Sequence, residues 1–321
     1  MEVGPSGQIQ ALIRAAVLAP SSHNTQPWLF RVSASDIDLI ADRTRALPIN
    51  DPRNRELSIS CGCALENLRV AAAGQGLGAD IKLLPDANDP DRLARVALGR
   101  GSPATSEDRA LVDCIERRRT HRGRFSPQAL GSETVDQLIK AAETEGTSLR
   151  PFETGEPRSQ VAALVAEGDA AQWADRAWRR ELAAWMRPRR LGDGLTVPTP
   201  ALALARLLVR SLDLGRTLGK RDRALAQTAP LLAVLGTAGD GPRDWLGAGQ
   251  ALQRILLAAC RLGLQASYLN QPVQVPSLRP RLQRLIGGGH PQVVLRLGYP
   301  AQAIPATPRR PIADVVRGPF R

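Results

Sequence analysis

The chain has 321 residues, of which 43% are hydrophobic, and a formal net charge of +12 at pH 7. This length allows one large or two ordinary domains with a packed core, so we expect a globular protein. No apolar run approaches the ~20 residues of a membrane span, and the N-terminal residues lack a basic segment followed by an apolar one. We therefore expect a cytoplasmic protein without a membrane partner.

The positive charge does not indicate nucleic-acid binding. Three of the 43 basic residues are lysines, the arginines are dispersed among Ala, Leu and Gly, and aromatic residues make up 3% of the chain. Such a chain offers no platform on which bases could stack. The four cysteines fall in predicted helices without a paired metal-ligand spacing, so we expect reduced, buried thiols and no metal site at Cys61, Cys63, Cys114 and Cys260.

Three segments of the first hundred residues recur later in the chain in the same order. The first pair is a predicted helix that leads into an extended segment, and the second is an apolar helix that ends at Gly-Leu before a strand. The third is a strand closed by glycine. Residues 9–16, 62–79 and 94–99 resemble residues 135–142, 249–266 and 293–298.

The repeat predicts a duplicated α+β unit. Chance similarity between Ala/Leu-rich helices is the alternative, but the second match runs for eighteen residues without a gap, which speaks against it. The second copy is longer, because the region from about 157 to 228 contains an insertion. This insertion contains Trp173, Trp178 and Trp185 and the turn-rich segment 192–200, and we expect part of it to be helical.

A polar segment follows the first predicted helix. Residues 19–28 read Ala-Pro-Ser-Ser-His-Asn-Thr-Gln-Pro-Trp and supply hydroxyl, amide and backbone groups suited to the polar edge of a flat heterocycle. A polar turn that satisfies the end of the helix is the alternative.

A cluster of arginines directly precedes the second copy of the first helix. Residues 117–125 read Arg-Arg-Arg-Thr-His-Arg-Gly-Arg-Phe, and guanidinium groups bind phosphate oxygens in bidentate fashion. A solvated basic face at the C-terminus of a helix is the alternative.

Together these segments resemble the nitroreductase family. Its members hold the phosphate of FMN with an Arg-Arg-Ser-x-Arg-x-Phe-like segment and contact the flavin ring with an Ala-Pro-Ser-x-x-Asn-x-Gln-Pro-Trp segment. A Gly-Tyr-Pro closes their last strand, as residues 298–300 do here. This chain departs from the pattern in two ways, because Thr120 replaces the usual serine and the phosphate segment follows the ring segment. Family dimers share each flavin site between subunits, so fusion of two units explains the order.

The resemblance extends over residues 8–318 and is strongest to the Acg-type fused subfamily, through segments 42–48, 51–58 and 269–272. In that subfamily a lid covers the flavin and restricts access to it. Residues 185–225 would form the lid here. The resemblance implies two nitroreductase-like units, at 1–105 and 106–321, with antiparallel sheets flanked by helices. A monomer would form a pseudo-dimer around one FMN, with further oligomerisation left open.

The family roles transfer residue by residue. The ring would be contacted by Pro20, Ser21, Ser22 and Asn24. The phosphate would be bound by Arg118, Arg119, Thr120 and Arg122, helped by Arg309 and Arg310. A backbone amide at Asn270 or Gln271 would meet flavin N5.

No residue is expected to act as a general acid or base, and the scattered histidines form no triad, although His121 could add a donor to the phosphate. The resemblance implies either flavin sequestration or restricted redox activity. The alternative is an FMN-dependent oxidoreductase in which NAD(P)H reduces the flavin, and a nitro compound, a quinone or a specialised metabolite exchanges electrons with it.

Overall fold

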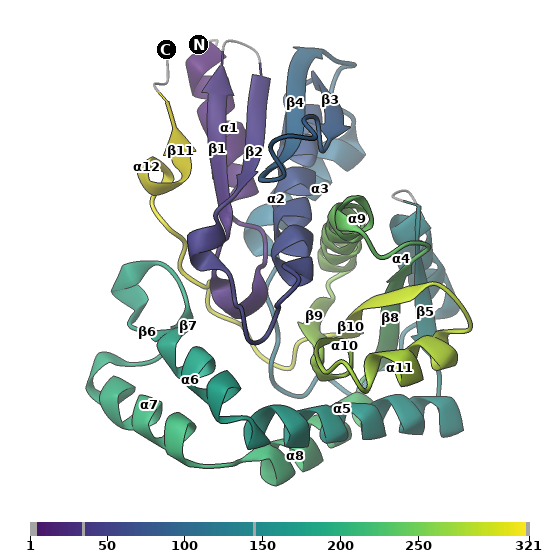
Figure 1. Ribbon diagram of the computed structural model, residues 1–321. Coiled ribbons are helices and arrows are strands. Elements are labelled where there is room, and N and C mark those ends of the chain that lie inside the picture. Colours follow the sequence, from purple (N-terminus) through teal and green to yellow (C-terminus); the bar gives the residue numbers. More distant parts are fainter. Residues whose placement is uncertain (1–4, 34–35, 144–145, 319–321) are drawn as a thin grey trace.

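The computed structural model describes residues 5–33, 36–143 and 146–318. It has two main sheets, antiparallel except for one short parallel pair, with two long helices between them (Figure 1). The first sheet has the strand order β11-β1-β2-β4-β3, and the second has the order β5-β8-β10-β9. The strands of the first sheet are β1 (Trp28–Ser33), β2 (Asp36–Ala41), β3 (Leu77–Leu83), β4 (Arg92–Arg100) and β11 (Val316–Arg317). Those of the second are β5 (Thr147–Phe152), β8 (Leu231–Thr237), β9 (Gln265–Tyr268) and β10 (His290–Gly298). The α+β class expected from the sequence is confirmed.

The two halves of the chain use the same order of elements. In the first half, α1 (Pro5–Ala16), β1, β2, α2 (Arg55–Gly74), β3 and β4 follow one another. The corresponding elements of the second half are α4 (Ser132–Glu143), β5, β8, α9 (Pro242–Arg261), β9 and β10, and they occupy the same places in their sheet. Gly76 and Gly263 end the two long helices with positive φ angles of 68° and 76°, as the Gly-Leu pattern predicts.

Helices α2 and α9 pack against each other along equivalent positions. Gly62 and Gly249 are matched in the repeat, and a Cβ on Gly249 would lie 2.8 Å from Gly62 Cα, so only glycine allows this crossing. Further along, Gln253 Nε2 donates to Asn67 Oδ1 at 2.6 Å, while Arg254 Nε lies 3.0 Å from Glu66 Oε1. In the repeat, residues 66 and 67 correspond to 253 and 254, so the contacts are reciprocal. This is the pattern that a two-fold axis produces.

The long helices are buried on nearly all sides, because each packs on its own sheet and on the other helix. This position explains why both helices carry apolar residues around most of their circumference. All four cysteines are buried free thiols, as expected: Cys61 and Cys63 lie in α2, Cys260 in α9, and Cys114 in α3 (Ser106–Arg117).

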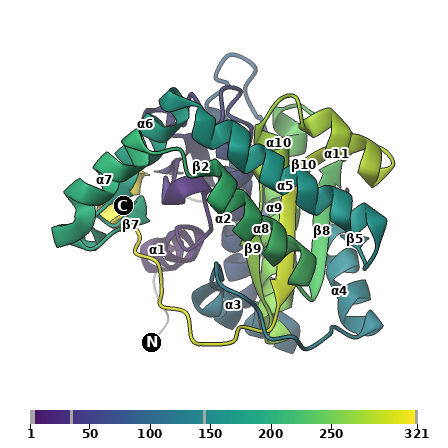
Figure 2. The same cartoon turned by 90° about the horizontal axis from the view of Figure 1, so that it is seen from below.

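The insertion between β5 and β8 is largely helical and runs across both halves on one side (Figures 1 and 2). It consists of α5 (Glu156–Ala174), α6 (Arg176–Ala184), the short strands β6 (Met186–Arg187) and β7 (Leu195–Thr196), α7 (Leu202–Ser211) and α8 (Gly215–Thr228). Helices α10 (Gln271–Gln274) and α11 (Arg279–Ile286) lie between β9 and β10.

The C-terminal segment returns to the first half. Helix α12 (Ile312–Val315) leads into β11, which pairs in parallel with β1. Over the described residues no helix has the length and apolar character needed to cross a membrane. The boundary between residues 105 and 106 stays a prediction.

Candidate functional site

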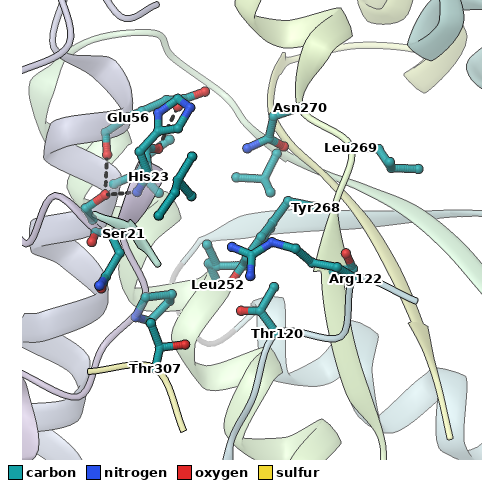
Figure 3. A pocket seen from close by; sticks show the side chains of 18 of the residues that line it. Ser21, His23, Glu56, Thr120, Arg122, Leu252, Tyr268, Leu269, Asn270 and Thr307 are labelled. Carbon is teal, nitrogen blue, oxygen red and sulfur yellow. Dashed lines mark hydrogen bonds between the residues drawn. The ribbon is translucent and has the colours of Figure 1, made fainter. Parts of the chain in front are cut away.

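A cavity of about 590 Å³ lies between the two halves of the chain, a volume typical of small-molecule sites. Figure 3 shows Ser21 and His23 on one wall, and Thr120, Arg122 and Asn270 on the opposite wall. Residues of α2 complete the first wall, and β9 and α10 contribute to the second. The insertion and the C-terminal segment 306–309 also line the cavity. Every residue predicted for the site lines it except Arg310.

The segment after α1 reaches the cavity through an unusual backbone conformation. His23 and Asn24 have positive φ angles of 49° and 54°, which non-glycine residues rarely adopt. Such strain is concentrated at functional sites in proteins. Ser21 Oγ accepts a hydrogen bond from Gln26 N at 2.9 Å, and Ser22 Oγ donates to Glu56 Oε2 at 2.6 Å. These bonds fix the hydroxyl groups at the edge of the cavity.

The arginine segment is positioned by α3, which begins with a capping box. Thr105 Oγ1 accepts from Asp108 N at 3.1 Å, and Asp108 Oδ2 accepts from Thr105 N at 2.9 Å. The helix ends at Arg117, and Arg118 then turns the chain toward the cavity. The pairing of Thr120 with Ala266 of β9 holds the following residues against the second half.

Buried positive charge gathers at this end of the cavity. Arg118 is 6% exposed, and its Nε and Nη1 have no hydrogen-bond partner among the described residues. Arg119 donates to the carbonyl oxygens of Glu116 and Arg118. Burial, with the charges of Arg118 and Arg119, lowers the pKa of Arg309 to about 9. Because these cations repel one another, an anion bound among them would be stabilised.

The two C-terminal arginines have different surroundings. Arg309 lines the cavity but donates to the carbonyl oxygens of residues 17–19 at 2.9 to 3.1 Å, which close the end of the first helical segment. Arg310 lies outside the cavity lining, where Nη1 donates to Gln26 O at 3.0 Å and pairs with Asp42 at 3.4 Å. We therefore leave Arg310 out of the candidate site.

The turn before α10 also lies at the cavity. Helix α10 begins at Gln271, Pro272 has no amide hydrogen, and Val273 N donates to Asn270 O at 2.9 Å, so the amides of Asn270 and Gln271 are the ones without an acceptor in the helix. Asn270 Oδ1 accepts from Val294 N at 3.0 Å, which fixes this turn on β10. Both Asn270 and Gln271 line the cavity.

Several polar residues of the cavity carry no functional signal in the sequence. Glu56, Asp169, Asp222, Tyr268 and Arg296 line it, although none of these residues was assigned a role from the sequence. Asp169 and Asp222 come from the insertion, where no spacing pointed to a site. Their juxtaposition is a tertiary feature, because α5 and α8 pack side by side.

His23 also lines the cavity, which the scattered histidine positions did not suggest. Burial lowers the pKa of His23 to about 4, so its imidazole is neutral at physiological pH. The ring of His121 lies outside the lining, and its Nε2 is 2.7 Å from Arg124 O. The suggested contact of His121 with phosphate is therefore left out of the candidate site.

Several polar contacts hold the insertion against the cavity. Glu181 of α6 accepts from Ile49 N at 2.9 Å and Asn50 N at 2.8 Å, and Trp178 Nε1 donates to Asn50 Oδ1 at 2.9 Å. The turn after α6 is bound by the polar segment itself, because Gly194 N donates to Asn24 O at 3.1 Å.

The side chain of Asn24 takes part in the same attachment. Its Nδ2 donates to Gly194 O at 3.4 Å and to Pro308 O at 3.3 Å. Gln26 Nε2 adds a bond to Gly192 O at 2.8 Å. Asn24 thus connects the polar segment to the insertion and to the C-terminal segment.

The residues of the insertion that line the cavity come from α5, α6, β7 and α8. Those of α7 do not line it, and the exposed side chains of Leu204 and Leu207 lie on this helix. The part of the insertion that lines the cavity therefore begins earlier in the chain, in α5, than the expected lid at 185–225.

Comparison with known proteins gives a consistent assignment. The model of the nitroreductase family matches residues 115–299, which is more than half of the chain. Two Mycobacterium tuberculosis proteins match over nearly the full length. "Putative NAD(P)H nitroreductase Rv3131" is 31% identical, with 97% of this chain and 91% of that protein covered. "Putative NAD(P)H nitroreductase acg" is 28% identical, with 96% and 94% covered.

Similar solved structures include a nitroreductase with bound FMN from Desulfitobacterium hafniense, with a TM-score of 0.38 and 16% identity over 65% of this chain and 97% of that one. A nitroreductase-like protein from Bacillus cereus has a TM-score of 0.40 and 18% identity over 64% and 92%. The family model and the full-length relatives place the sequence unambiguously. The chain belongs to the nitroreductase family, within its Acg-type group.

Proposed function

We propose that the cavity binds one FMN per chain and that the insertion acts as a lid that restricts access to it. The observation that carries this proposal is the convergence of two segments from different halves on one cavity. The polar segment 20–24 and the arginine segment 118–122 are about a hundred residues apart in the sequence, yet they line opposite walls. These are the two segments that resemble the flavin-binding motifs of the family.

The phosphate of FMN would lie at the arginine end. Arg118 is a buried cation with two nitrogens that have no partner in the described part of the chain, and Arg119, Thr120 and Arg122 also line the cavity. Charge-assisted hydrogen bonds from guanidinium groups suit a phosphate, whereas a neutral ligand would leave the clustered cations uncompensated. Arg309 would contribute mainly through its charge, since carbonyl oxygens already occupy several of its donors.

The flavin ring would lie between the two walls. Ser21, Ser22 and Pro20 would contact its polar edge from the first half, and a backbone amide at Asn270 or Gln271 would donate to N5. When bound, FMN supplies the hydride or electron transfer, and the surrounding amides and arginines stabilise negative charge on it. Asn24 would act by holding the lid turn beside the ring, since its amide donates to Gly194 O and Pro308 O.

The lid contacts favour restricted redox activity or flavin sequestration. Glu181, Trp178 and Gly194 attach the insertion to the first half, and Trp178, Leu182 and Leu195 face the cavity. Closure of this kind excludes water and limits exchange with bulk solvent. In the same proposal the two halves are fused units of a pseudo-dimer, so that one chain completes the site.

The second candidate is an FMN-dependent oxidoreductase that turns over freely with NAD(P)H. The names of the two mycobacterial relatives favour this reductant. Nitro compounds, quinones or a specialised metabolite would be the electron acceptors.

The test begins with the stoichiometry and identity of the flavin. Purified protein should take up FMN in preference to FAD, at one per chain. Two FMN per chain, or tight binding of FAD alone, would contradict the single composite site. Stopped-flow mixing with NADPH or NADH then separates the two candidates. Slow bleaching that speeds up when the lid contacts are removed supports restricted access, whereas fast bleaching in the unaltered chain supports free turnover.

A further inference from the structure

Beside α10, the cavity wall carries hydrogen-bond acceptors that lack donors among the described residues. Asp169 of α5 is 5% exposed, and only one of its carboxylate oxygens is engaged, by Gln271 Nε2 at 3.1 Å. Asp169 Oδ2 and Gln271 Oε1 have no hydrogen-bond partner within the part of the chain that the structure describes. Both residues line the cavity. A buried aspartate held by a single neutral donor either keeps a proton or, once it is ionised, requires a further donor.

The orientation of the Gln271 amide is fixed by its neighbours. Gln271 Nε2 donates to Asp169 Oδ1 at 3.1 Å and to Asp222 Oδ2 at 3.2 Å, so a flipped amide would place its oxygen against two carboxylates. Gln271 Oε1 must therefore be the free atom. It adds a second acceptor beside Asp169 Oδ2.

Close helix packing holds these groups in place. A Cβ on Gly168 would lie 2.5 Å from Gln271 Cβ, so glycine at this position lets α5 approach α10 closely. Gly215 of α8 packs in the same way on the backbone of residues 169 and 170. The acceptors are thus parts of a rigid wall, and a side-chain rearrangement would not easily supply the missing donor.

Neighbouring cations do not neutralise Asp169. Arg221 pairs with Asp222 at 3.2 Å, and its side chain is 59% exposed. Arg296 donates to Gly123 O at 2.8 Å and His121 O at 3.0 Å, and the acidic group on which its charge acts is Asp222. Asp222 therefore has an ion-pair partner, whereas Asp169 has no ion pair among the described residues, and the charge of the more distant Arg221 only partly offsets the effect of burial on its pKa.

We propose that Asp169, with Gln271 Oε1 and the adjacent Asp222, binds a cationic hydrogen-bond donor of the substrate, such as a primary ammonium or an amidinium group. The inference rests on the proposed function, because the backbone amide at residue 270 or 271 is the group assigned to flavin N5. A substrate held by its cation at this wall would present its reducible part beside that position. The substrate class is then an amine-bearing or amidine-bearing electron acceptor.

The test compares three probes of similar shape and different charge: 4-nitrobenzylamine, 4-nitrobenzyl alcohol and 4-nitrobenzoate. Their dissociation constants are measured by isothermal titration calorimetry on the oxidised protein at pH 8, without a reductant. The amine should bind at least tenfold more tightly than the alcohol, the strength expected of one charge-assisted hydrogen bond, and the benzoate should bind most weakly. Equal binding of amine and alcohol to the unaltered protein would overturn the proposal.

Variants identify the residue responsible. Asp169→Asn keeps the bond from Gln271 and should reduce the preference for the amine to about one, and Asp222→Asn should reduce it less, because Asp222 is paired with Arg221. Glu167→Gln is the matched control on α5, since Glu167 is exposed and pairs with Arg281 outside the cavity. If the preference for the amine persists in both aspartate variants, the cation binds at another wall of the cavity, and the proposed subsite is refuted.

Flavin uptake is measured separately from probe binding. A chain that takes up no FMN refutes the proposed function, whereas a flavin-loaded chain that does not prefer the amine refutes the acidic subsite. Calorimetry needs no flavin signal, so the subsite is tested in either case.

Discussion

Arg122 offers the most direct test of the phosphate site. Its side chain points into the cavity, and it has no hydrogen bond or ion pair with other described residues (Figure 3). Replacing Arg122 with alanine should therefore leave the fold intact. Arg119 is less suitable, because its guanidinium also closes the end of α3 through the carbonyl oxygens of Glu116 and Arg118.

The expected magnitude follows from the loss of one charge-assisted contact. Such a bond contributes about 1.5–3 kcal/mol, so Arg122→Ala should weaken FMN binding by roughly 10-fold to 150-fold. Riboflavin lacks the phosphate and should bind the variant and the unaltered protein almost equally. Arg124→Ala is the matched control, since Arg124 is exposed and lies outside the cavity lining.

The assay is a fluorescence titration of flavin-free protein with FMN and with riboflavin, at constant ionic strength. The difference between the two losses isolates the phosphate contribution. If riboflavin binding fell as much as FMN binding, Arg122 would have a structural role. If neither changed, the phosphate would lie elsewhere.

Three further predictions concern stability and access. Gly249→Ala should lower the free energy of unfolding by about 2–3 kcal/mol or more in denaturant titrations, because its Cβ would meet backbone atoms, whereas Gly131→Ala, with open space around it, should change it little. Burial, with the charge of Asp222, raises the pKa of Asp169 to about 7, so the folded chain keeps a proton that the unfolded chain loses between about pH 4 and 7. The free energy of unfolding of the unaltered protein should fall as pH rises through this window. The Asp169→Asn variant does not titrate there, so its stability relative to the unaltered protein should be higher at pH 8 than at pH 4, by on the order of 2–4 kcal/mol. An equal difference in stability at both pH values would contradict the assigned titration. Glu181→Ala removes the acceptor of two backbone amides and should speed flavin reduction by dithionite severalfold in stopped-flow traces, while an unchanged rate would mean that this contact does not control access.

The sequence alone determined the class of fold and the placement of its main elements. The ungapped match of residues 62–79 with 249–266 predicted two long helices that end at Gly-Leu, and α2 and α9 end there. The two helix sequences have stayed similar because both helices are buried on nearly all sides, and few substitutions would preserve their packing and volume. The polar segment 19–28 and the arginine segment 117–125 could also be recognised in the sequence, since such polar residues are unusual next to apolar helices.

The repeat also predicted which residues of the two halves are equivalent, but only the structure shows which of them are in contact. Gly62 and Gly249 are matched in the sequence, but their close approach depends on how α2 and α9 cross. Arg310 shows that neighbouring residues of one motif can have different surroundings in the structure. It belongs to the same Pro-Arg-Arg-Pro as Arg309, yet its side chain contacts Gln26 and Asp42, and of the two only Arg309 lines the cavity.

The tertiary structure alone decided the acidic part of the cavity and the reach of the lid. Asp169, Asp222 and Gln271 stand on three helices, and no local spacing connects them. They meet because glycines let α5 approach α8 and α10, a contact between distant segments that periodicity and motif cannot encode. The boundaries of the insertion were visible in the sequence, but which of its helices faces the cavity depended on the side of the two halves across which it packs.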